Sequence, residues 1–269
     1  MWLARTGIMA SSSSMDIDAL AFITAATITD NTQKSAVNQL VKDLKSANIW
    51  TKMKAIYPFV GGTATTHKWN LKDPRDLDVA YRLSFIGGGT HSATGYLPNG
   101  TTAYANTFLT PSLSLGINSA HLSYYSRTST TSDSNNYVIG ADNFNGFSAI
   151  ILRNNVKYFR FTNITTAYED AGYNGALSTS GFFVGTQDAN NVKLFRNNTN
   201  IAQNTGTDSR PIVDAEVYIG CTNSYSLPQA YTTAESAFAS IGNGLTDTES
   251  ANFYTAVQAY QTTLNRQVV

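Results

Sequence analysis

The sequence contains a single cysteine, Cys221, so it cannot form an internal disulfide. Cys221 ends the apolar run Val217–Cys221, and no neighbouring group would lower its pKa, so we expect a small buried strand residue rather than a catalytic thiol. Charged residues make up only 13% of the chain, about half the usual share, and 18 basic residues balance 18 acidic ones. Without a basic face to neutralise phosphates, nucleic acid is not an expected partner.

Long apolar runs are also absent. No stretch approaches the ~20 apolar residues of a membrane span, so we expect no membrane insertion. The opening residues MWLARTGIMASSSSM are broken by Arg5 and Gly7 and lack the apolar core of a signal peptide, which predicts assembly in the cytoplasm without Sec-type export. Residues 1–15 are predicted to form a flexible arm, in which Trp2, Leu3 and Ile8 would contact a partner surface.

The histidines show no metal-binding pattern. His67, His91 and His121 are far apart in the sequence and form no H-x-x-x-H or H-E-x-x-H motif. His67 lies in AIYPFVGGTATTHKWN, where Gly61-Gly62 indicates a turn, and a histidine hydrogen-bonded to the backbone of a loop is the favoured interpretation over a catalytic one.

Acidic residues are too few to favour hydrolysis of glycans. Glycosidases need two carboxyl groups flanking the scissile bond. Asp76 and Asp78 have suitable spacing but fall in a charged turn and are expected to be solvated, and Asp214 and Glu216 have the same spacing before a strand. The sequence also lacks nucleophile-elbow and Walker motifs. We therefore predict no catalytic residues and no enzyme, with a polysaccharide depolymerase as the least favoured alternative.

Two helical segments lie at opposite ends of the chain. Residues 16–54 contain a short helix over 16–26 and a longer one that begins after Asp30, which we expect to cap it reciprocally with Gln33. Residues 243–269 contain a helix that opens on a capping box of Thr246 and Glu249. Each has an apolar stripe to bury, and the termini of one domain are often close together. The two terminal helices are therefore predicted to lie side by side.

The middle of the chain, residues 55–242, has the texture of a β domain. Brief aromatic and β-branched runs alternate with Gly, Asn, Ser, Thr and Asp, and no internal repeat is visible. The predicted strands are 80–86, 102–105, 121–127, 137–141, 148–152, 157–161, 181–186, 192–196, 217–221 and 237–241. Many short strands without intervening helices predict a mainly β fold, a jelly-roll β-sandwich with a helix at each end.

Loops of this domain offer candidate ligand contacts. Four tyrosines are predicted to lie in loops where their rings would stack on sugars: Tyr96, Tyr137, Tyr168 and Tyr173. Two loop regions are rich in the oxygen ligands that calcium prefers: Asp133, Asn135, Asn136, Asp142, Asn143 and Asn145, then Asp188, Asn190 and Asn191. Asp and Asn also dominate turns, so the expectation is no cofactor, with calcium left open.

Two segments carry a resemblance to a known group. WTKMKAIYPFVGGTATTHKWNLKDPRDLDVAYRLSF and AFASIGNGLTDTESANFYTAVQAYQTTLNRQV resemble phage virion-associated proteins that contain a concanavalin A-like (laminin-G-like) jelly-roll module. The resemblance covers about residues 16–269 and is weakest between about 128 and 215. It implies the jelly-roll fold, a place in the virion and a homo-oligomer, and it transfers no catalytic or metal-binding residue.

The resemblance and the residues together predict a virion structural protein of the tail, baseplate or head fibre. Its jelly roll would bind a host-surface glycan or another virion subunit. The alternative is a purely architectural decoration or cement protein that binds no glycan. The four tyrosines and the uncharged surface favour adhesion, whereas in the architectural alternative the apolar arm would become ordered on a partner surface.

Overall fold

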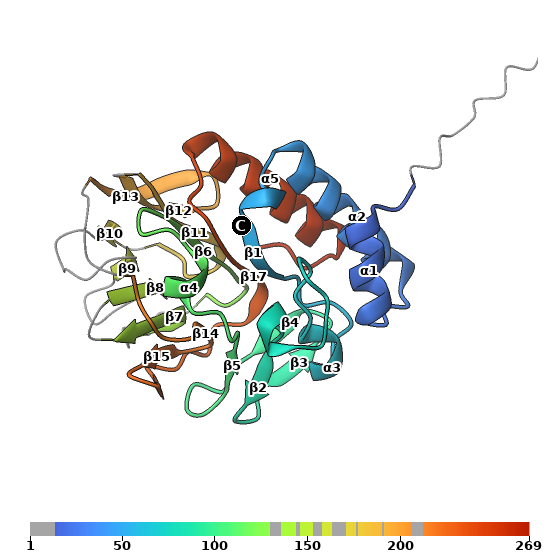
Figure 1. Ribbon diagram of the computed structural model, residues 1–269, viewed down its shortest axis with the longest axis horizontal. Coiled ribbons are helices and arrows are strands. Elements are labelled where there is room, and N and C mark those ends of the chain that lie inside the picture. Colours follow the sequence, from blue (N-terminus) through green and yellow to red (C-terminus); the bar gives the residue numbers. More distant parts are fainter. Residues whose placement is uncertain are drawn as a thin grey trace, which may run out of the picture.

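The computed structural model describes residues 14–129, 136–143, 146–152, 158–162, 171–175, 177–189, 191–205 and 212–268. Within these residues the strands form two stacked sheets, and the long helices lie along one side of them (Figure 1). The predicted fold class, a concanavalin A-like jelly-roll sandwich with terminal helices, is confirmed.

The helices α1, α2 and α5 begin where the sequence predicts, whereas the short helices α3 and α4 were not predicted. The described helical elements are α1 (Ile17–Ala25), α2 (Asn31–Ser46), α3 (Ala64–His67), α4 (Pro111–Ser114), α5 (Asp247–Thr263) and the 3₁₀ turns η1 (Trp50–Lys52) and η2 (Asp78–Ala80). Thr246 and Glu249 form the predicted capping box. Asp30 caps α2 by accepting from the Gln33 N–H at 2.8 Å, but the Gln33 side chain accepts from the Gly61 N–H at 3.0 Å instead of reaching back.

The two terminal helices pack against each other, as predicted (Figure 1). Leu40 and Val41 of α2 share one buried core with Phe253 and Val257 of α5. The same core includes Phe238 of the neighbouring sheet. The stripes of both helices are therefore buried against one face of that sheet.

We call that sheet the central sheet. Its described strands follow the order β13-β12-β11-β6-β17-β4-β3, with β1 beside β17. They are β1 (Met53–Tyr57), β3 (Thr90–Ser92), β4 (Gly95–Leu97), β6 (Ser119–Ser126), β11 (Gly181–Asp188), β12 (Asn191–Arg196), β13 (Thr199–Thr205) and β17 (Ser236–Gly242). Adjacent residues face opposite sides: Phe182 belongs to the core under the helices, and Phe183 to the core between the sheets. Both faces of its middle strands, β6, β11 and β17, are covered.

The second sheet, which we call the outer sheet, follows the order β10-β9-β8-β7-β14-β5-β2, with β15 paired to β7 and β16. Its described strands are β2 (Ser84–Ile86), β5 (Tyr104–Asn106), β7 (Tyr137–Asn143), β8 (Gly146–Leu152), β9 (Tyr158–Thr162), β10 (Ala171–Asn174), β14 (Tyr218–Ile219), β15 (Thr222–Ser224) and β16 (Leu227–Gln229). Ala105, Ile139 and Ile219 face the central sheet. None of its described residues belongs to the core that the helices form. We call its other side the open face.

One predicted strand is mostly wrong. Of residues 80–86 only Ser84–Ile86 are extended, because Ala80 ends η2 and Tyr81 has a left-handed φ of 59°. Side chains, and not a neighbouring strand, donate hydrogen bonds to the backbone carbonyls here. Asn70 donates to the Ala80 carbonyl at 3.0 Å, and the Tyr57 hydroxyl donates to the Tyr81 carbonyl at 2.7 Å. The alternation of apolar residues there reflects local packing and not a ladder.

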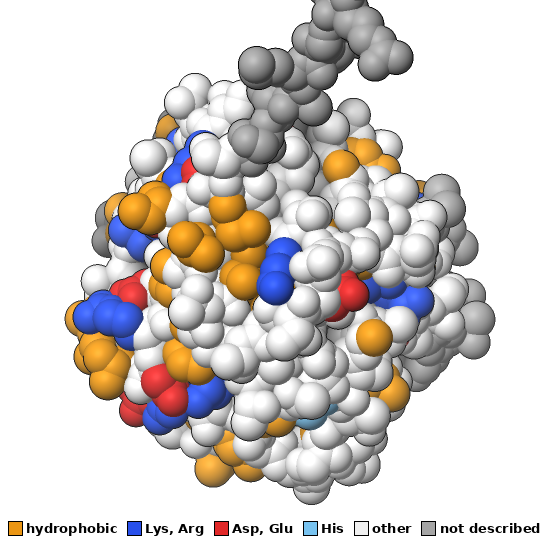
Figure 2. All heavy atoms as spheres, turned by 90° about the vertical axis from the view of Figure 1, so that its right-hand side faces the viewer, with side chains coloured by type: hydrophobic (Ala, Val, Ile, Leu, Met, Phe, Trp, Pro, Cys, Tyr) orange, Lys and Arg blue, Asp and Glu red, His pale blue; other side chains and the backbone are white. Residues whose placement is uncertain are grey.

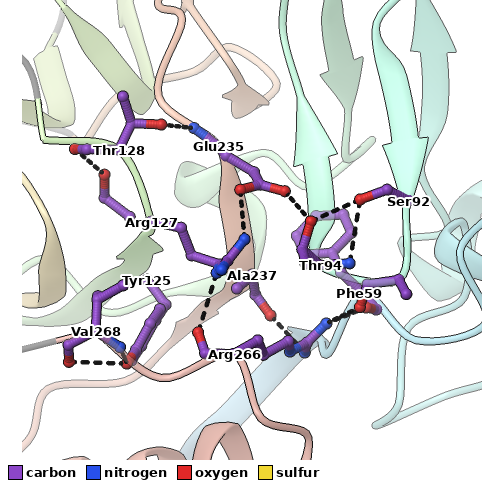
Figure 3. A network of polar contacts seen from close by, with 12 residues as sticks. Phe59, Ser92, Thr94, Tyr125, Arg127, Thr128, Glu235, Ala237, Arg266 and Val268 are labelled. Atoms are coloured by element: carbon purple, nitrogen blue, oxygen red, sulfur yellow. Dashed lines mark hydrogen bonds and ion pairs between the residues drawn. The ribbon is translucent and has the colours of Figure 1, made fainter.

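The end of the chain is anchored by a buried polar network (Figure 3). Arg266 is only 2% exposed, and its guanidinium donates to the carbonyls of Pro58, Phe59 and Ala237. Glu235 accepts from Arg127 at 2.8 Å and from the Thr94 hydroxyl. Its carboxylate is therefore committed to holding the fold together, and Arg127 in turn donates to the Arg266 carbonyl at 3.0 Å.

Candidate functional site

The open face carries a group of tyrosines. Because Ala105 and Ile219 point into the core, the preceding residues Tyr104 and Tyr218 point to the open face. Their rings are stacked, with centroids 4.6 Å apart and planes at 29°, and Tyr231 lies 6.5 Å from Tyr104. Tyr218 is buried, whereas Tyr104 and Tyr231 are half-buried. The three rings lie close together, with Tyr104 and Tyr231 partly accessible, and we call this group the tyrosine platform.

A carboxylate and an amide flank the platform. Asn106 pairs opposite Tyr218, and its Nδ2 donates to Glu216 Oε2 at 2.6 Å. Glu216 is half-buried. Burial, with smaller contributions from Tyr104 and Glu216, raises the pKa of Tyr218 to about 12, so its hydroxyl stays protonated at neutral pH. The platform therefore combines ring surface with groups that accept and donate hydrogen bonds.

A strained hairpin borders the same face. β15 runs parallel to β7 and turns into β16 through Tyr225 and Ser226, which have positive φ values of 53° and 68°. Two-residue hairpin turns of this kind favour Asn-Gly, because other residues are strained there. Tyr225 is nevertheless 62% exposed at the tip. An exposed aromatic ring kept on a strained turn is consistent with a recognition role.

The hairpin rests on Asp142 of β7. The Asp142 carbonyl accepts from the Tyr225 N–H at 3.1 Å, and its carboxyl is hydrogen-bonded to Ser224. The buried oxygens Asp142 Oδ1, Thr222 Oγ1 and Asn223 Oδ1 have no hydrogen-bond partner within the described chain. Burial raises the pKa of Asp142. Unsatisfied buried acceptors are uncommon and costly, so this hairpin is held less firmly than the sheet beneath it.

The sequence-predicted tyrosines have different positions. Tyr96 is not in a loop: it lies in β4, is 0% exposed and packs against Phe85 and His91, so it cannot stack on a sugar. Tyr137 is half-buried at the start of β7, with its ring 5.8 Å from that of Phe147. Tyr173 is half-buried in β10 against the core between the sheets. Tyr168 and the arm residues Trp2, Leu3 and Ile8 lie outside the described residues.

His67 bonds to backbone as predicted, although it ends a short helix and is buried. Its Nε2 accepts from the Gly62 N–H at 3.2 Å, so Nδ1 carries the proton and donates to His91 Nδ1 at 3.0 Å. Burial lowers the pKa of His67 to about 3, and it lowers that of buried His121 to about 4. These histidines are neutral structural groups at neutral pH.

The two acidic pairs lie in different settings. Asp76 and Asp78 are exposed, as expected, and they also form ion pairs: Arg82 bonds to both, and Lys68 pairs with Asp76 at 2.6 Å. Asp214 is exposed and accepts from the Ser112 hydroxyl at 2.6 Å. Only the second pair, through Glu216, belongs to the open face.

Several other sequence features can now be placed. Of the calcium candidates, Asp133, Asn135, Asn145 and Asn190 lie outside the described residues, and the described part of the chain contains no group of three His, Cys, Asp or Glu residues suited to a metal ion. Cys221 is buried between β14 and β15, and burial raises the pKa of its thiol to about 12. No helix among the described residues is long and apolar enough to cross a membrane.

An apolar groove on the helical side is the main competing surface (Figure 2). It has a volume of about 430 Å³ and includes Met15, Leu20 and Ile28 around α1. Its lining contains no aromatic ring, and Lys34 is its one charged residue. It therefore lacks the stacking surface and the paired polar groups that the open face provides.

Comparisons with known proteins give fold relationships alone. No protein-family model and no curated protein matches the sequence. Domain 4 of AbnA, a GH43 extracellular arabinanase from Geobacillus stearothermophilus solved with arabinotriose, matches with a TM-score of 0.51 and 13% identity, over 75% of this chain and 98% of that one.

Two larger proteins also contain this fold. A Trypanosoma rangeli sialidase mutant with trans-sialidase activity matches with a TM-score of 0.54 and 9% identity over 83% of this chain. A botulinum neurotoxin type C chain, from a study of its interaction with two ganglioside molecules, matches with a TM-score of 0.54 and 11% identity over 79%. This chain spans only 39% of the sialidase chain and 53% of the neurotoxin chain.

These neighbours overturn the prediction that the chain is not an enzyme. The fold is shared with chains named for a sialidase and an arabinanase, so it occurs in glycan-active enzymes, and the missing catalytic motifs are no ground for excluding activity. None of the three neighbours is a virion protein. What they share with this chain is a β fold found in proteins that recognise carbohydrates.

Proposed function

We propose that this chain is a carbohydrate-recognition module that binds glycans on the open face of its outer sheet. The observation that carries the proposal is the stacked pair Tyr104–Tyr218, flanked by the Glu216–Asn106 hydrogen bond, on a sheet face that no helix core covers. Two fold neighbours, an arabinanase domain solved with arabinotriose and a neurotoxin that interacts with gangliosides, support the same class of ligand.

The platform has the chemistry that sugars require. The electron-rich face of an aromatic ring attracts the C–H groups on the flat side of a pyranose or furanose ring, and a tyrosine hydroxyl provides a polar edge. Glu216 and Asn106 supply an acceptor and an amide for hydroxyl groups. A shallow surface of this kind predicts weak binding of a single sugar, and several copies together would strengthen it.

Tyr104→Ala tests the proposal, because it removes an accessible ring without touching either core. Binding to immobilised oligosaccharides should fall at least about fivefold, as for an aromatic hot spot. The matched control is Tyr254→Ala, a half-buried tyrosine on α5 at the helical side. Equal losses in both variants, or no loss for Tyr104→Ala at unchanged melting temperature, would reject this face as the site.

The biological setting remains a proposal based on sequence resemblance. The two segments similar to phage virion proteins support a tail, baseplate or head-fibre component, with the arm residues Trp2, Leu3 and Ile8 binding another subunit. Mass spectrometry of purified phage particles tests this placement. Presence in the particle together with silence on a glycan array would favour the architectural alternative, whereas absence from particles would remove the virion setting and leave the glycan site untouched.

A further inference from the structure

The described ionisable groups near the tyrosine platform, other than the tyrosines themselves, carry negative charge. They are Glu216 beside the platform and Asp142 under the hairpin, with exposed Asp214 two residues before Glu216. A carboxylate held beside aromatic rings attracts groups that donate hydrogen bonds or carry positive charge, and it repels other carboxylates.

The lysines and arginines whose side chains the structure describes do not lie beside the tyrosine platform. They lie on the helices, on the central sheet or in the loops that join them. Several are paired with acids there, including Lys45 with Asp16 and Lys52 with Glu249. Recognition of an acidic sugar normally uses an arginine fork or a lysine. No described arginine or lysine adjoins Tyr104, Tyr218 and Glu216; Arg160 of the same sheet lies on β9, which β7 and β8 separate from β14.

Glu216 is positioned to discriminate. Asn106 Nδ2 holds Oε2 at 2.6 Å, whereas Oε1 has no hydrogen-bond partner among the described residues. The side chain is half-buried, so water screens its charge less than at a fully exposed position. The available oxygen can accept from a sugar hydroxyl or an ammonium group, but it can only repel the carboxylate of a sialic or uronic acid.

We infer that the open face selects neutral or amine-bearing sugars over acidic ones, with Glu216 as the residue that determines this specificity. The inference rests on the proposed function. The ligand inferred for this chain differs from those of two fold neighbours, which are associated with trans-sialidase activity and with gangliosides. The shared fold fixes neither the ring surface nor the charge beside it.

The test uses the full chain on an array of matched oligosaccharides. Neutral galactose and arabinose oligomers are paired with galacturonic acid oligomers, neutral lactosamines with their sialylated forms, and N-acetylglucosamine oligomers with de-acetylated glucosamine oligomers. Each neutral sugar should bind about three- to tenfold more tightly than its acidic counterpart, the scale of one like-charge contact in a partly hydrated site. Glucosamine oligomers should bind at least as tightly as their acetylated forms.

Glu216→Gln then identifies the residue responsible. Glutamine retains an oxygen for Asn106, so the site keeps its shape while it loses the charge. The preference for neutral over acidic sugars should shrink about threefold or more, and raising the salt concentration should shrink it in the wild type but much less in the variant. The control Asp43→Asn removes one charge from α2, where Asp43 accepts from Gln39, and should leave the preference unchanged.

The outcomes distinguish two failures. Tighter binding of acidic sugars, or a preference that Glu216→Gln does not alter, overturns the specificity inference. If Tyr104→Ala still abolishes binding in either of these two outcomes, the proposed function stands although the specificity inference fails. If the protein binds no oligosaccharide on the array, both the specificity inference and the proposed function are overturned.

Discussion

The two sheets use the same alternation of side chains to different ends. In the central sheet, adjacent residues such as Phe182 and Phe183 enter two different cores, because helices cover one face and the outer sheet covers the other. In the outer sheet, Ala105 enters a core while its neighbour Tyr104 remains partly exposed. A half-buried aromatic residue of the central sheet therefore lies at the edge of a core, whereas one on the outer sheet can present its ring to a ligand. Under the proposed function, stability depends on the covered sheet and recognition on the open face, and each prediction below tests that division.

Acid should produce the largest effect, and it should act on the covered side. His67 and His121 are buried and neutral, with folded pKa values of about 3 and about 4. Unfolding returns each to an ordinary pKa near 6.5, so the unfolded chain binds more protons at any pH between these values. Stability is fully present above about pH 6.5 and should fall by several kcal/mol as the pH drops towards 4. Urea denaturation at a series of pH values measures this loss.

His121→Gln checks the assignment. His121 donates from Nδ1 to the Asn243 carbonyl at 2.6 Å, and its Nε2 lies 3.0 Å from the Ser240 hydroxyl. Glutamine has an amide that can replace these bonds but does not titrate. The variant should be less stable at pH 7 and should lose less stability on acidification. An unchanged pH dependence in this variant would mean that His121 does not contribute to the acid sensitivity.

Phe253→Ala should have the next largest effect. Phe253 is fully buried on α5, with its ring 5.1 Å from that of Phe182 and 5.9 Å from that of Phe238. The cavity should cost about 3–5 kcal/mol of unfolding free energy. Tyr104→Ala removes a ring of similar size from the open face and should cost no more than about 1–2 kcal/mol, including its stacking on Tyr218. Similar losses in chemical denaturation would contradict the division between the sheets.

The sequence predicted the parts of this comparison that depend on neighbouring residues. The Thr246–Glu249 capping box and the Asp30 cap are local, as are the stripe through Leu40 and Val41 and most strand positions. Strands were expected over 102–105 and 217–221, yet the contact between Tyr104 and Tyr218 joins residues that lie far apart in the chain. No local pattern records which strands pair.

Burial of the remaining candidates depended on tertiary contacts as well. Tyr96 resembles a loop residue beside Pro98 and Asn99, but β4 pairs with β17 and carries its ring into the core. The hairpin of β15 and β16 was missed because Tyr225-Ser226 lacks the glycine that normally signals such a turn. Alternation in Tyr104-Ala105-Asn106 was the available signal for the open face, since it places an aromatic and an amide on one side.

Ser226→Gly should have a smaller effect of opposite sign. Ser226 has a φ of 68°, a conformation that glycine adopts without strain. The substitution should stabilise the protein by up to about 1 kcal/mol while Tyr225 remains in place for binding. Thermal melting measures the gain, and the control Ser112→Gly, in α4, should destabilise instead. Destabilisation by Ser226→Gly would show that the serine side chain makes an essential contact at the tip.

Asp142→Asn should have the smallest effect and tests how firmly the hairpin packs against the Asp142 carboxyl at the border of the open face. Burial raises the folded pKa of Asp142 above its unfolded value, so the charged form carries a penalty that is fully present above the folded pKa and disappears as the pH falls below the unfolded one. Asparagine removes the charge, so the variant should be more stable than the wild type at pH 7, by no more than about 1 kcal/mol for a half-buried group. The difference in stability should vanish near pH 3.

Because the histidines titrate equally in both proteins, they cancel from this comparison. A difference that persists at pH 3 would mean that asparagine gains a hydrogen bond instead, whereas no difference at pH 7 would mean that water reaches the carboxylate and that the hairpin stands clear of it.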